Sequence, residues 1–359
     1  MSDPVDVGHG THQPIPSLDG IRALAVTIVL FGHARVSQLI PGGFGVTIFF
    51  FLSGLLITTL FLREAGRYGA VSLKAFYIRR LLRLSPPLFV TMALVYLAVA
   101  LGLHPGKLDP APILSQIFYV YNYYAAWSAD PIEGAHGFNV LWSLAVEEHF
   151  YLIFPLLFLL WLKNVVRTGH ILIILAGFCA WRLVQWHVFA VEANDIYMRS
   201  DTRFDSILWG CFLALLQGNG RADRLFPDRP LPRAMILLAA TVVILFCFIL
   251  RDPAFRETWR YTLQGIALMP FFHYAVRRPD LLLFRPLNWH PVALVGSLSY
   301  SLYLIHYVLL IWLETHGLLP SLPLAAALLV GALALIYAAA LSRFVEAPVR
   351  KLRNRITGH

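Results

Sequence analysis

The sequence predicts an all-α fold built from membrane-spanning helices, and its composition and hydropathy pattern support this prediction. Hydrophobic residues make up 58% of the 359 residues, charged residues only 14%, and the mean hydropathy is +0.66. A soluble domain carries about 25% charged residues. The apolar residues gather in runs of about 20, the length that crosses a hydrocarbon core of about 30 Å as a helix.

Candidate spans follow one another along the whole chain. The ten spans are residues 18–40, 44–62, 86–103, 140–162, 170–191, 204–219, 233–250, 258–276, 293–313 and 322–342. A further apolar segment, 113–127, is short and aromatic, so we interpret it as re-entrant or interfacial. The transmembrane domain is therefore predicted to cover 18–342, between a flexible cytoplasmic tail at 1–17 and a basic cytoplasmic tail at 343–359.

The positions of the basic residues test this count of spans. With a cytoplasmic N-terminus, the segments expected on the cytoplasmic side carry 20 of the 29 Lys and Arg residues. If 113–127 also crossed the membrane, every later loop would change sides and this bias would disappear. The sequence therefore predicts ten transmembrane helices with both termini in the cytoplasm. The net charge of +9 belongs to these loops, so no nucleic-acid partner is expected.

The cysteines and the N-terminal segment exclude several other interpretations. Cys179, Cys211 and Cys247 lie inside predicted spans without metal-ligand spacing, so we interpret them as buried apolar side chains and expect no metal site. Residues 1–17 lack Lys and Arg, so no cleavable signal is expected. Since no soluble domain is predicted, the activity should take place in or beside the bilayer.

Two polar side chains interrupt the first span. Arg22 and His33 are eleven residues apart. At about 100° and 1.5 Å per residue they share one helical face and lie about 16 Å apart. Asp19 lies on the same side as Arg22, and an ion pair near the interface is the simpler interpretation of these two. His33 is harder to explain by packing, because a polar residue inside the membrane is costly. The pattern predicts a polar track that enters the membrane from one side.

A basic segment precedes the third span and contains Arg79, Arg80 and Arg83. Arg80 and Arg83 are three residues apart and therefore neighbours on one helical face. This charge is typical of a cytoplasmic loop or of contact with anionic lipid. Guanidinium groups also match the geometry of phosphate, which favours a clamp for a phosphorylated donor. Charge alone leaves both interpretations open.

Other ionisable residues occur in or near later spans. They are Glu147, Glu148 and Tyr151 at the outer end of the fourth span, Arg203 and Asp205 before the sixth, and His306 inside the ninth. Glu147 and Tyr151 share a face because they are four residues apart. For Arg203 and Asp205, ion pairs at the interface are the alternative interpretation. Polar residues at such positions usually mark substrate paths or buried pairs.

Six motifs, in order, resemble those of the membrane acyltransferase-3 family. They are Leu18-Asp19-Gly20-Ile21-Arg22 with His33, Gly45 to Gly54, Arg80 and Arg83 before a proline, Trp142-Ser143-Leu144 with Glu147 and Phe150-Tyr151, Tyr300 to His306, and Glu346-Ala347-Pro348. The resemblance implies ten transmembrane helices and transfer of an acyl group, usually acetyl, from cytoplasmic acyl-coenzyme A. It also implies an acceptor hydroxyl, often of a glycan, on the outer side. The chain resembles the family's stand-alone members, without a fused esterase-like domain.

The reaction that the resemblance implies assigns roles to these residues. Transfer from a thioester needs a base for the hydroxyl proton and donors for the oxyanion. His33 is expected to be the base, Arg22 to contact the pantetheine or thioester carbonyl, and Glu147 to orient His33 or bind the acceptor. The expected contacts of the coenzyme A phosphates are Arg79, Arg80 and Arg83. The expected acceptor contacts are Asp19, Glu148, Tyr151, Arg203, Asp205 and His306.

The partners and location follow from the same expectation. Acyl-coenzyme A is a donor substrate, not a permanently bound cofactor, and a glycan hydroxyl is the acceptor. A bacterial inner membrane is the expected location. A transporter is the alternative function, since charges also line transport paths, although no Gly/Pro-broken helices occupy matching positions in two halves. A membrane scaffold without catalysis would leave the polar track unexplained.

Overall fold

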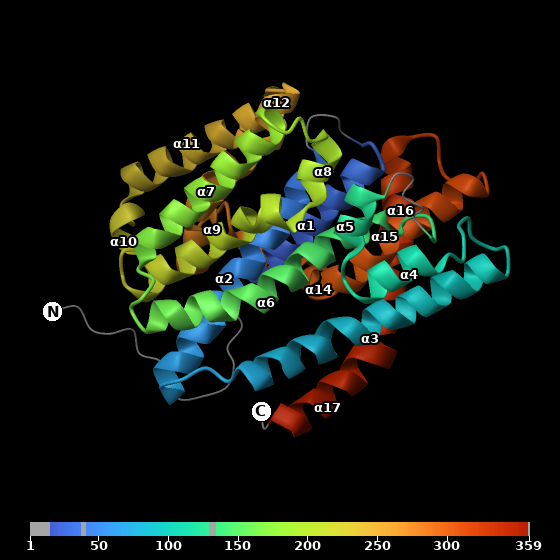
Figure 1. The fold of residues 1–359 in the computed structure, drawn as a ribbon, viewed down its shortest axis with the longest axis horizontal. Coiled ribbons are helices and arrows are strands. Elements are labelled where there is room, and N and C mark those ends of the chain that lie inside the picture. The colour runs from blue at the N-terminus through green and yellow to red at the C-terminus, as the bar shows by residue number, and fades with distance from the viewer. Residues whose placement is uncertain (1–14, 37–40, 129–133, 358–359) are drawn as a thin grey trace.

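The computed structural model describes residues 15–36, 41–128 and 134–357. Within these residues every regular element is helical, and the β-type pairing is an isolated bridge between Gly106 and Ala135. The long helices lie side by side in one bundle (Figure 1). The predicted all-α fold is therefore confirmed. The parts of the predicted first span and tails that lie outside the described residues are 1–14, 37–40 and 358–359.

Each of the ten predicted spans overlaps one of the longer helices. The longer helices are α1 (Leu18–His33), α2 (Gly42–Tyr68), α3 (Leu73–Ala100), α6 (Trp142–Leu162), α7 (Thr168–His187), α9 (Ser200–Gly218), α11 (Pro230–Ile249), α13 (Trp259–Arg277), α15 (Ser299–Thr315) and α16 (Pro323–Leu341). Short helices join or extend them: α4 (Pro110–Ile117), α5 (Tyr121–Trp127), η1 (Phe138–Leu141), α8 (Ala193–Met198), α10 (Ala222–Leu225), α12 (Pro253–Glu257), η2 (Arg285–Asn288), α14 (His290–Ser297), the π-helical turn η3 (Ser342–Glu346) and α17 (Ala347–Thr357).

Six helical segments of the described chain are long and apolar enough to cross a membrane. They are α2, α3, α6 together with η1, α7, α11, and α16 continued into α17. The pair α14–α15, bent by 70°, would be a seventh. Helix α1 has 16 residues and is about 24 Å long, and α9 and α13 carry several polar side chains. Six or seven spans are thus shown by length and composition, and the count of ten stays a prediction.

The exposed surface of the bundle is apolar, as a lipid-facing surface must be. Helix α11 illustrates this, since only 11% of its most apolar stretch is buried and Leu238 and Ile249 are 65% and 73% exposed. Water-soluble proteins rarely leave apolar patches of this extent uncovered. Hydrocarbon chains of a bilayer would cover them. The chain is therefore an integral membrane protein.

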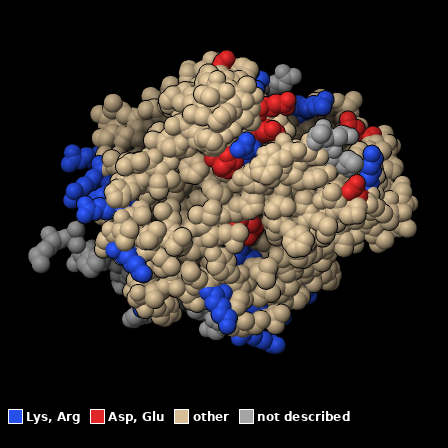
Figure 2. Space-filling model, viewed as in Figure 1, with Lys and Arg blue, Asp and Glu red and all other residues tan. Residues whose placement is uncertain are grey.

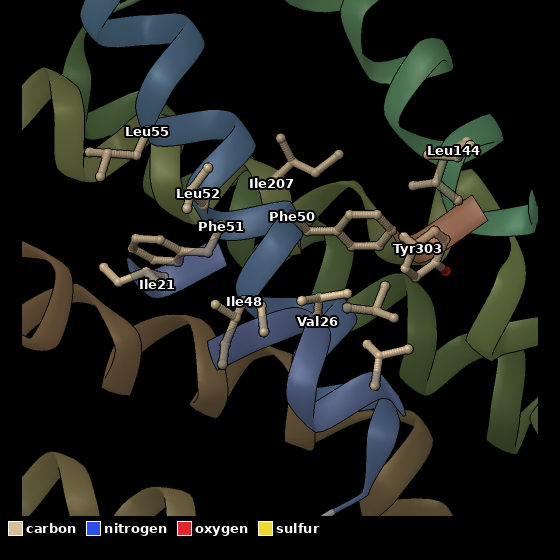
Figure 3. Packing of buried hydrophobic residues seen from close by; sticks show 14 of the residues in the cluster. Ile21, Val26, Ile48, Phe50, Phe51, Leu52, Leu55, Leu144, Ile207 and Tyr303 are labelled. Carbon is tan, nitrogen blue, oxygen red and sulfur yellow. The ribbon is translucent and has the colours of Figure 1, made fainter. Parts of the chain in front are cut away.

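Helix α2 lies at the centre of the packing. Side chains of α1, α2, α6, α9 and α15 converge there in a buried hydrophobic cluster (Figure 3). Helices α2 and α9 approach each other closely where Gly54 and Gly210 face each other's backbones. A Cβ at either glycine would come within 1.9 Å of a carbonyl oxygen of the other helix. Small residues permit such an approach, which gains dispersion energy where the hydrophobic effect is weak.

Two boundaries differ from the sequence prediction. The predicted third span begins at 86, but α3 begins at Leu73 and continues through Pro86 and Pro87. The interior prolines remove two backbone donors, yet tertiary packing keeps the helix continuous, with Pro87 almost fully buried. The segment 113–127 is not one helix, because α4 and α5 are separated at Tyr119, whose φ is +57°.

The bundle has two chemically different ends. One, here called the basic end, holds α10, α17 and the start of α3. Figure 2 shows Lys and Arg along its left and lower margins. In a loop there, Arg278 bridges Asp228 and Asp280 at 2.7 and 2.8 Å. The hydrogen bond from Arg278 lowers the pKa of Asp280 to about 2. The opposite end, called the His33 end, holds the last turn of α1, the first turn of α2, and α8 and α12.

Candidate active site

A pair of histidines lies at the His33 end. His33 is the last residue of α1, and its Nδ1 lies 2.8 Å from Nε2 of His306 in α15. The two rings are stacked with their centroids 5.1 Å apart, and the ring of Tyr307 lies 4.4 Å from that of His33. His306 is buried, whereas His33 keeps partial exposure. The structure thus joins two residues that are 273 positions apart in the sequence.

The hydrogen bonds determine which nitrogen carries the proton on each neutral ring. Nδ1 of His306 lies 2.6 Å from the carbonyl oxygen of Tyr303, and a carbonyl oxygen only accepts. This Nδ1 is therefore the donor, so Nε2 of neutral His306 is the acceptor and Nδ1 of His33 donates to it. Nε2 of His33 is left with its lone pair. The pair can present an oriented imidazole base.

The side chain of Tyr303 fixes α15 against the start of α6. Its hydroxyl donates to the carbonyl oxygen of Val140 at 3.0 Å and lies 2.8 Å from the hydroxyl of Ser143. All three residues are buried. A buried hydroxyl without a partner would cost about 1–3 kcal/mol. These contacts therefore hold the backbone carbonyl of Tyr303, which accepts the hydrogen bond from Nδ1 of His306. The Ser143 of the Trp142-Ser143-Leu144 motif therefore has a positioning contact.

A second polar cluster surrounds Arg80 of α3. Its Nε lies 2.9 Å from an oxygen of Glu148, and its Nη2 lies 3.6 Å from an oxygen of Glu147. The guanidinium carbon is 3.1 Å from the ring centroid of Tyr151, whose hydroxyl is hydrogen-bonded to that of Ser53 in α2. Two carboxylates and an aromatic face thus neutralise and orient one arginine.

This geometry places three predicted site residues away from the expected partners. Glu147 was expected either to orient His33 or to bind the acceptor, and among the described residues its ion pair is with Arg80. The residue that accepts a hydrogen bond from Nδ1 of His33 and orients its ring is His306. Arg80 was expected to meet phosphates, but its charge is already balanced by Glu147 and Glu148.

Arg22 and Arg83 lie toward the basic end. Arg22 lies 2.5 Å from Asp19, so the ion pair considered for these residues is present. Helix α1 is continuous from Arg22 to His33, so the axial separation of about 16 Å holds. Arg83 is exposed, has no ion pair among the described residues, and is repelled by Arg22, Arg80 and Arg353. Arg22 and Arg80 are each paired with carboxylates, so Arg83 carries the available positive charge of this region, which can attract an anion.

Arg79, the remaining predicted phosphate contact, belongs to a different pair. Its Nη2 lies 3.2 Å from Glu64 near the end of α2. Glu64 also accepts a hydrogen bond from the backbone of Ser72 at 2.8 Å. Arg79 therefore helps to fix the α2–α3 connection, and Arg83 carries the more available charge.

Arg203 and Asp205, the predicted acceptor contacts before the sixth span, are both fully buried. Asp205 forms an ion pair of 2.8 Å with Arg182 of α7, which also donates to the carbonyl oxygen of Thr258. Arg182 was missed by the sequence prediction, because a single arginine in an apolar span gives no signal of its partner. The pair joins α7, α9 and the start of α13. The sequence alternative of an ion pair is present for Asp205, although buried.

Arg203 lies in an aromatic cage. Its guanidinium carbon is 4.0 Å from the ring centroid of Tyr261 and 5.1 Å from that of Tyr197. It donates to the hydroxyl of Thr47 at 3.3 Å and to the carbonyl oxygen of Tyr197 at 3.1 Å. Cation–π contacts of this kind partly replace the lost hydration of a buried cation. Its Nε has no hydrogen-bond partner among the described residues.

Two cavities open on the bundle. One of about 360 Å³ lies between the first turn of α2, α8, α12 and α13. Its polar lining includes Arg256, Glu257, Arg260 and Gln264. The other, of about 1100 Å³, lies between α4, α5, α6 and α9 and has a mostly apolar lining. No residue of the smaller cavity was among the predicted site residues, because its members come from four separate helices that meet only in the folded chain.

The comparisons with known proteins agree with the motifs. The sequence profile of the acyltransferase-3 family, an acyltransferase domain, matches residues 15–343. The chain belongs to this family. It is 34% identical to the peptidoglycan O-acetyltransferase OatA of Listeria monocytogenes over 94% of the chain and 56% of that protein. It is 29% identical to the O-acetyltransferase OatA of Staphylococcus aureus over 94% of the chain and 57% of that protein.

The chain thus spans a little more than half the length of these curated relatives. No solved structure matches it.

Proposed function

We propose that this protein is an integral-membrane O-acetyltransferase that moves an acetyl group from cytoplasmic acetyl-coenzyme A to a glycan hydroxyl on the outer side. The observation that carries the proposal is the His33–His306–Tyr303 chain, which leaves one imidazole lone pair available. Family membership and the names of the relatives support the reaction class. The glycan acceptor is inferred from the relatives named for acetylation of peptidoglycan.

The proposed topology has ten transmembrane helices and both termini in the cytoplasm of a bacterial inner membrane. The excess of Lys and Arg at the basic end supports this orientation, since such residues remain on the cytoplasmic side. In this orientation Arg83 lies toward the cytoplasm and His33 toward the outside. Helix α1 then runs between the side of the donor and the side of the acceptor.

In the proposed mechanism Arg22 and Arg83 hold the phosphates of the donor. The acyl-pantetheine arm extends along α1 over about 16 Å to His33. Arg80, held by Glu147 and Glu148, lies beside this path and interacts with the donor as it extends. Charge-assisted contacts of guanidinium with phosphate favour this arrangement.

The chemical step is direct transfer. Nε2 of His33 accepts the proton of the acceptor hydroxyl, whose oxygen forms a bond to the thioester carbonyl carbon. The tetrahedral intermediate then breaks its carbon–sulfur bond, and the coenzyme A thiolate takes the proton back from His33. The products are an acetyl ester and free coenzyme A, so atoms and charge balance. His306 keeps Nδ1 of His33 protonated and its Nε2 available throughout.

Coenzyme A release by the purified full chain in lipid nanodiscs tests this function. The unmodified protein should release thiol from acetyl-coenzyme A when a glycan acceptor is present. His33→Ala should lower the rate by about 10²- to 10⁴-fold, the usual contribution of a general base. His187→Ala is the matched control, because His187 is an exposed last residue of α7. Transfer by His33→Ala at the unmodified rate would refute the proposal, and acceptor transport without thiol release would indicate a transporter.

A further inference from the structure

The smaller cavity, here called the Arg256 cavity, lies at the same end of the bundle as the histidine pair. The first turn of α2 separates the two. Gly42 packs on Gly32, the neighbour of His33, and a Cβ at Gly32 would lie 2.5 Å from the Cα of Gly42. On the other side, a Cβ at Gly43 would lie 2.7 Å from the hydroxyl of Tyr197, which lines the cavity. A molecule that occupies the cavity is therefore close to His33.

The charges in the wall of the cavity do not balance. Glu257 accepts a hydrogen bond from Tyr261 at 2.5 Å and lies 3.4 Å from Arg260, so its charge is satisfied. Arg256, in the wall, has no ion pair or hydrogen bond of its side chain among the described residues. The buried Nε of Arg260 is also without a partner there. The lining thus has one cation more than it has carboxylates.

A second cation lies directly behind this wall. Arg203 is completely buried, and no carboxylate in the described part of the chain pairs with it. Three of its contacts, Tyr261, Tyr197 and Thr47, also line the cavity, and it has further contacts with the rings of Phe50 and Trp142. The nearby acids are engaged elsewhere, Asp201 with Arg199 and Asp205 with Arg182. Burial of a cation without a counter-charge is costly, and an anion in the cavity would reduce that cost.

We propose that the Arg256 cavity binds an acidic group, a carboxylate or a phosphate, carried by the acceptor glycan. This inference rests on the proposed function, because it assigns the cavity to the acceptor side. Arg256 meets the acid directly, Gln264 and the free Nε of Arg260 are further donors, and Arg203 contributes charge from behind. The aromatic rings of Tyr197 and Tyr261 give sugar rings an apolar face. The cavity selects acidic acceptors and holds the chain whose hydroxyl reaches His33.

Binding of small saccharides to the full chain in nanodiscs tests the proposal. The probes are a hexuronate disaccharide, a hexose 6-phosphate and a neutral hexose disaccharide, measured by calorimetry without any donor. At least one acidic probe should bind about tenfold more tightly than the neutral one, as expected for a charge-assisted contact. The two acidic probes distinguish carboxylate from phosphate. Equal binding of all three probes, or binding of none, would overturn the proposal.

Variants of two arginines in the connection between α11 and α13 provide the matched comparison. Arg256→Gln should weaken binding of the preferred acidic probe about tenfold and leave the neutral probe unchanged. Arg256→Lys should keep most of the preference, because it keeps the charge. Arg251→Gln removes the same charge from an exposed residue outside the cavity and should have no effect. An equal loss of acidic-probe binding in Arg251→Gln would show that the general positive potential of this region attracts the probe. That result would contradict a specific site in the Arg256 cavity.

The binding assay is independent of catalysis. His33→Ala should bind the acidic probe normally while releasing no thiol. If the unmodified protein releases no thiol but prefers the acidic probe, the proposed function fails and the anion site stands. If thiol release requires His33 but no acidic preference is found, the anion site fails alone.

Discussion

Two buried polar pairs in this bundle look alike in the sequence and differ in what they can do. Arg182 and Asp205 have side chains with no exposure, and Arg182 donates to two backbone carbonyl oxygens besides its carboxylate partner. His33 and His306 also form a buried contact, but His33 remains partly exposed and keeps one nitrogen free. The Arg182–Asp205 pair is closed to solvent and holds helices together, whereas a pair with an accessible nitrogen lone pair can take part in a reaction.

The largest effect on stability is expected at the Arg182–Asp205 pair. Asp205→Ala leaves Arg182 as an uncompensated buried charge, which should lower the free energy of unfolding by about 3–5 kcal/mol. Asp228→Ala is the control, because Asp228 pairs with Arg278 at a surface where such pairs contribute about 0–1 kcal/mol. Unfolding by SDS titration in mixed micelles measures both.

The same experiment distinguishes a structural role from acceptor binding. If Asp205 were an acceptor ligand, Asp205→Asn would fold with normal stability and raise the acceptor KM. The structure predicts the opposite: a less stable protein whose folded fraction has an unchanged acceptor KM. A stable Asp205→Asn protein with a raised acceptor KM would remove the contrast between the two pairs.

An intermediate effect is expected at His306, which acts as a positioning residue through His33. His306→Leu removes the acceptor for Nδ1 of His33 and should lower kcat by about 10- to 100-fold, less than the 10²- to 10⁴-fold contribution of the base itself. His306→Gln restores an acceptor oxygen and should recover much of the activity. His316→Leu, an exposed site on the same side of the bundle, is the control.

The pH profile of kcat adds a readout that general misfolding would not change. With His306→Leu, the free imidazole of His33 exchanges tautomers, so the acidic limb of the profile should move while the donor KM stays the same. If His306→Gln is as inactive as His306→Leu, the hydrogen bond does not position the base.

Sequence patterns predicted the helices well, because each span is a run of apolar residues and its hydropathy is a local property. They predicted the partners poorly, because pairing depends on helix packing. His306 was selected as an intramembrane histidine at the end of the Tyr300–His306 motif, and nothing local indicates its contact with His33. Glu147 and Glu148 were selected from their place beside an apolar span, and nothing local indicates that the packing of α3 against α6 pairs them with Arg80. The residues of the Arg256 cavity come from four helices in three distant parts of the sequence, which meet only through packing.

The start of the third predicted span also depends on helix packing. The Pro86-Pro87 pair is typical of a helix start, and local propensity favours a start there. In the structure the helix begins thirteen residues earlier, at Leu73, which places Arg80 and Arg83 on a continuous helix. Tertiary packing thus decided where two predicted donor contacts would lie.

The smallest effect is expected at the basic end, where two arginines three residues apart have opposite environments. Arg80 is saturated by Glu147 and Glu148, and Arg83 has no ion pair among the described residues. Arg83→Gln should therefore raise the KM for acetyl-coenzyme A about tenfold, the loss of one charge-assisted contact, with little change in kcat or in stability.

The control and the contrast come from two neighbouring sites. Arg67→Gln removes a cation near the end of α2 that lies over the ring of Tyr68, and it should leave the donor KM unchanged. Arg80→Gln should instead destabilise the fold, because it leaves two carboxylates unpaired, and any change in its donor KM would be secondary. If Arg80→Gln proves stable and has the larger donor KM, then the saturated arginine is the phosphate contact. In that case an unpaired charge or an available lone pair would not distinguish the reactive residues of this bundle from its structural ones.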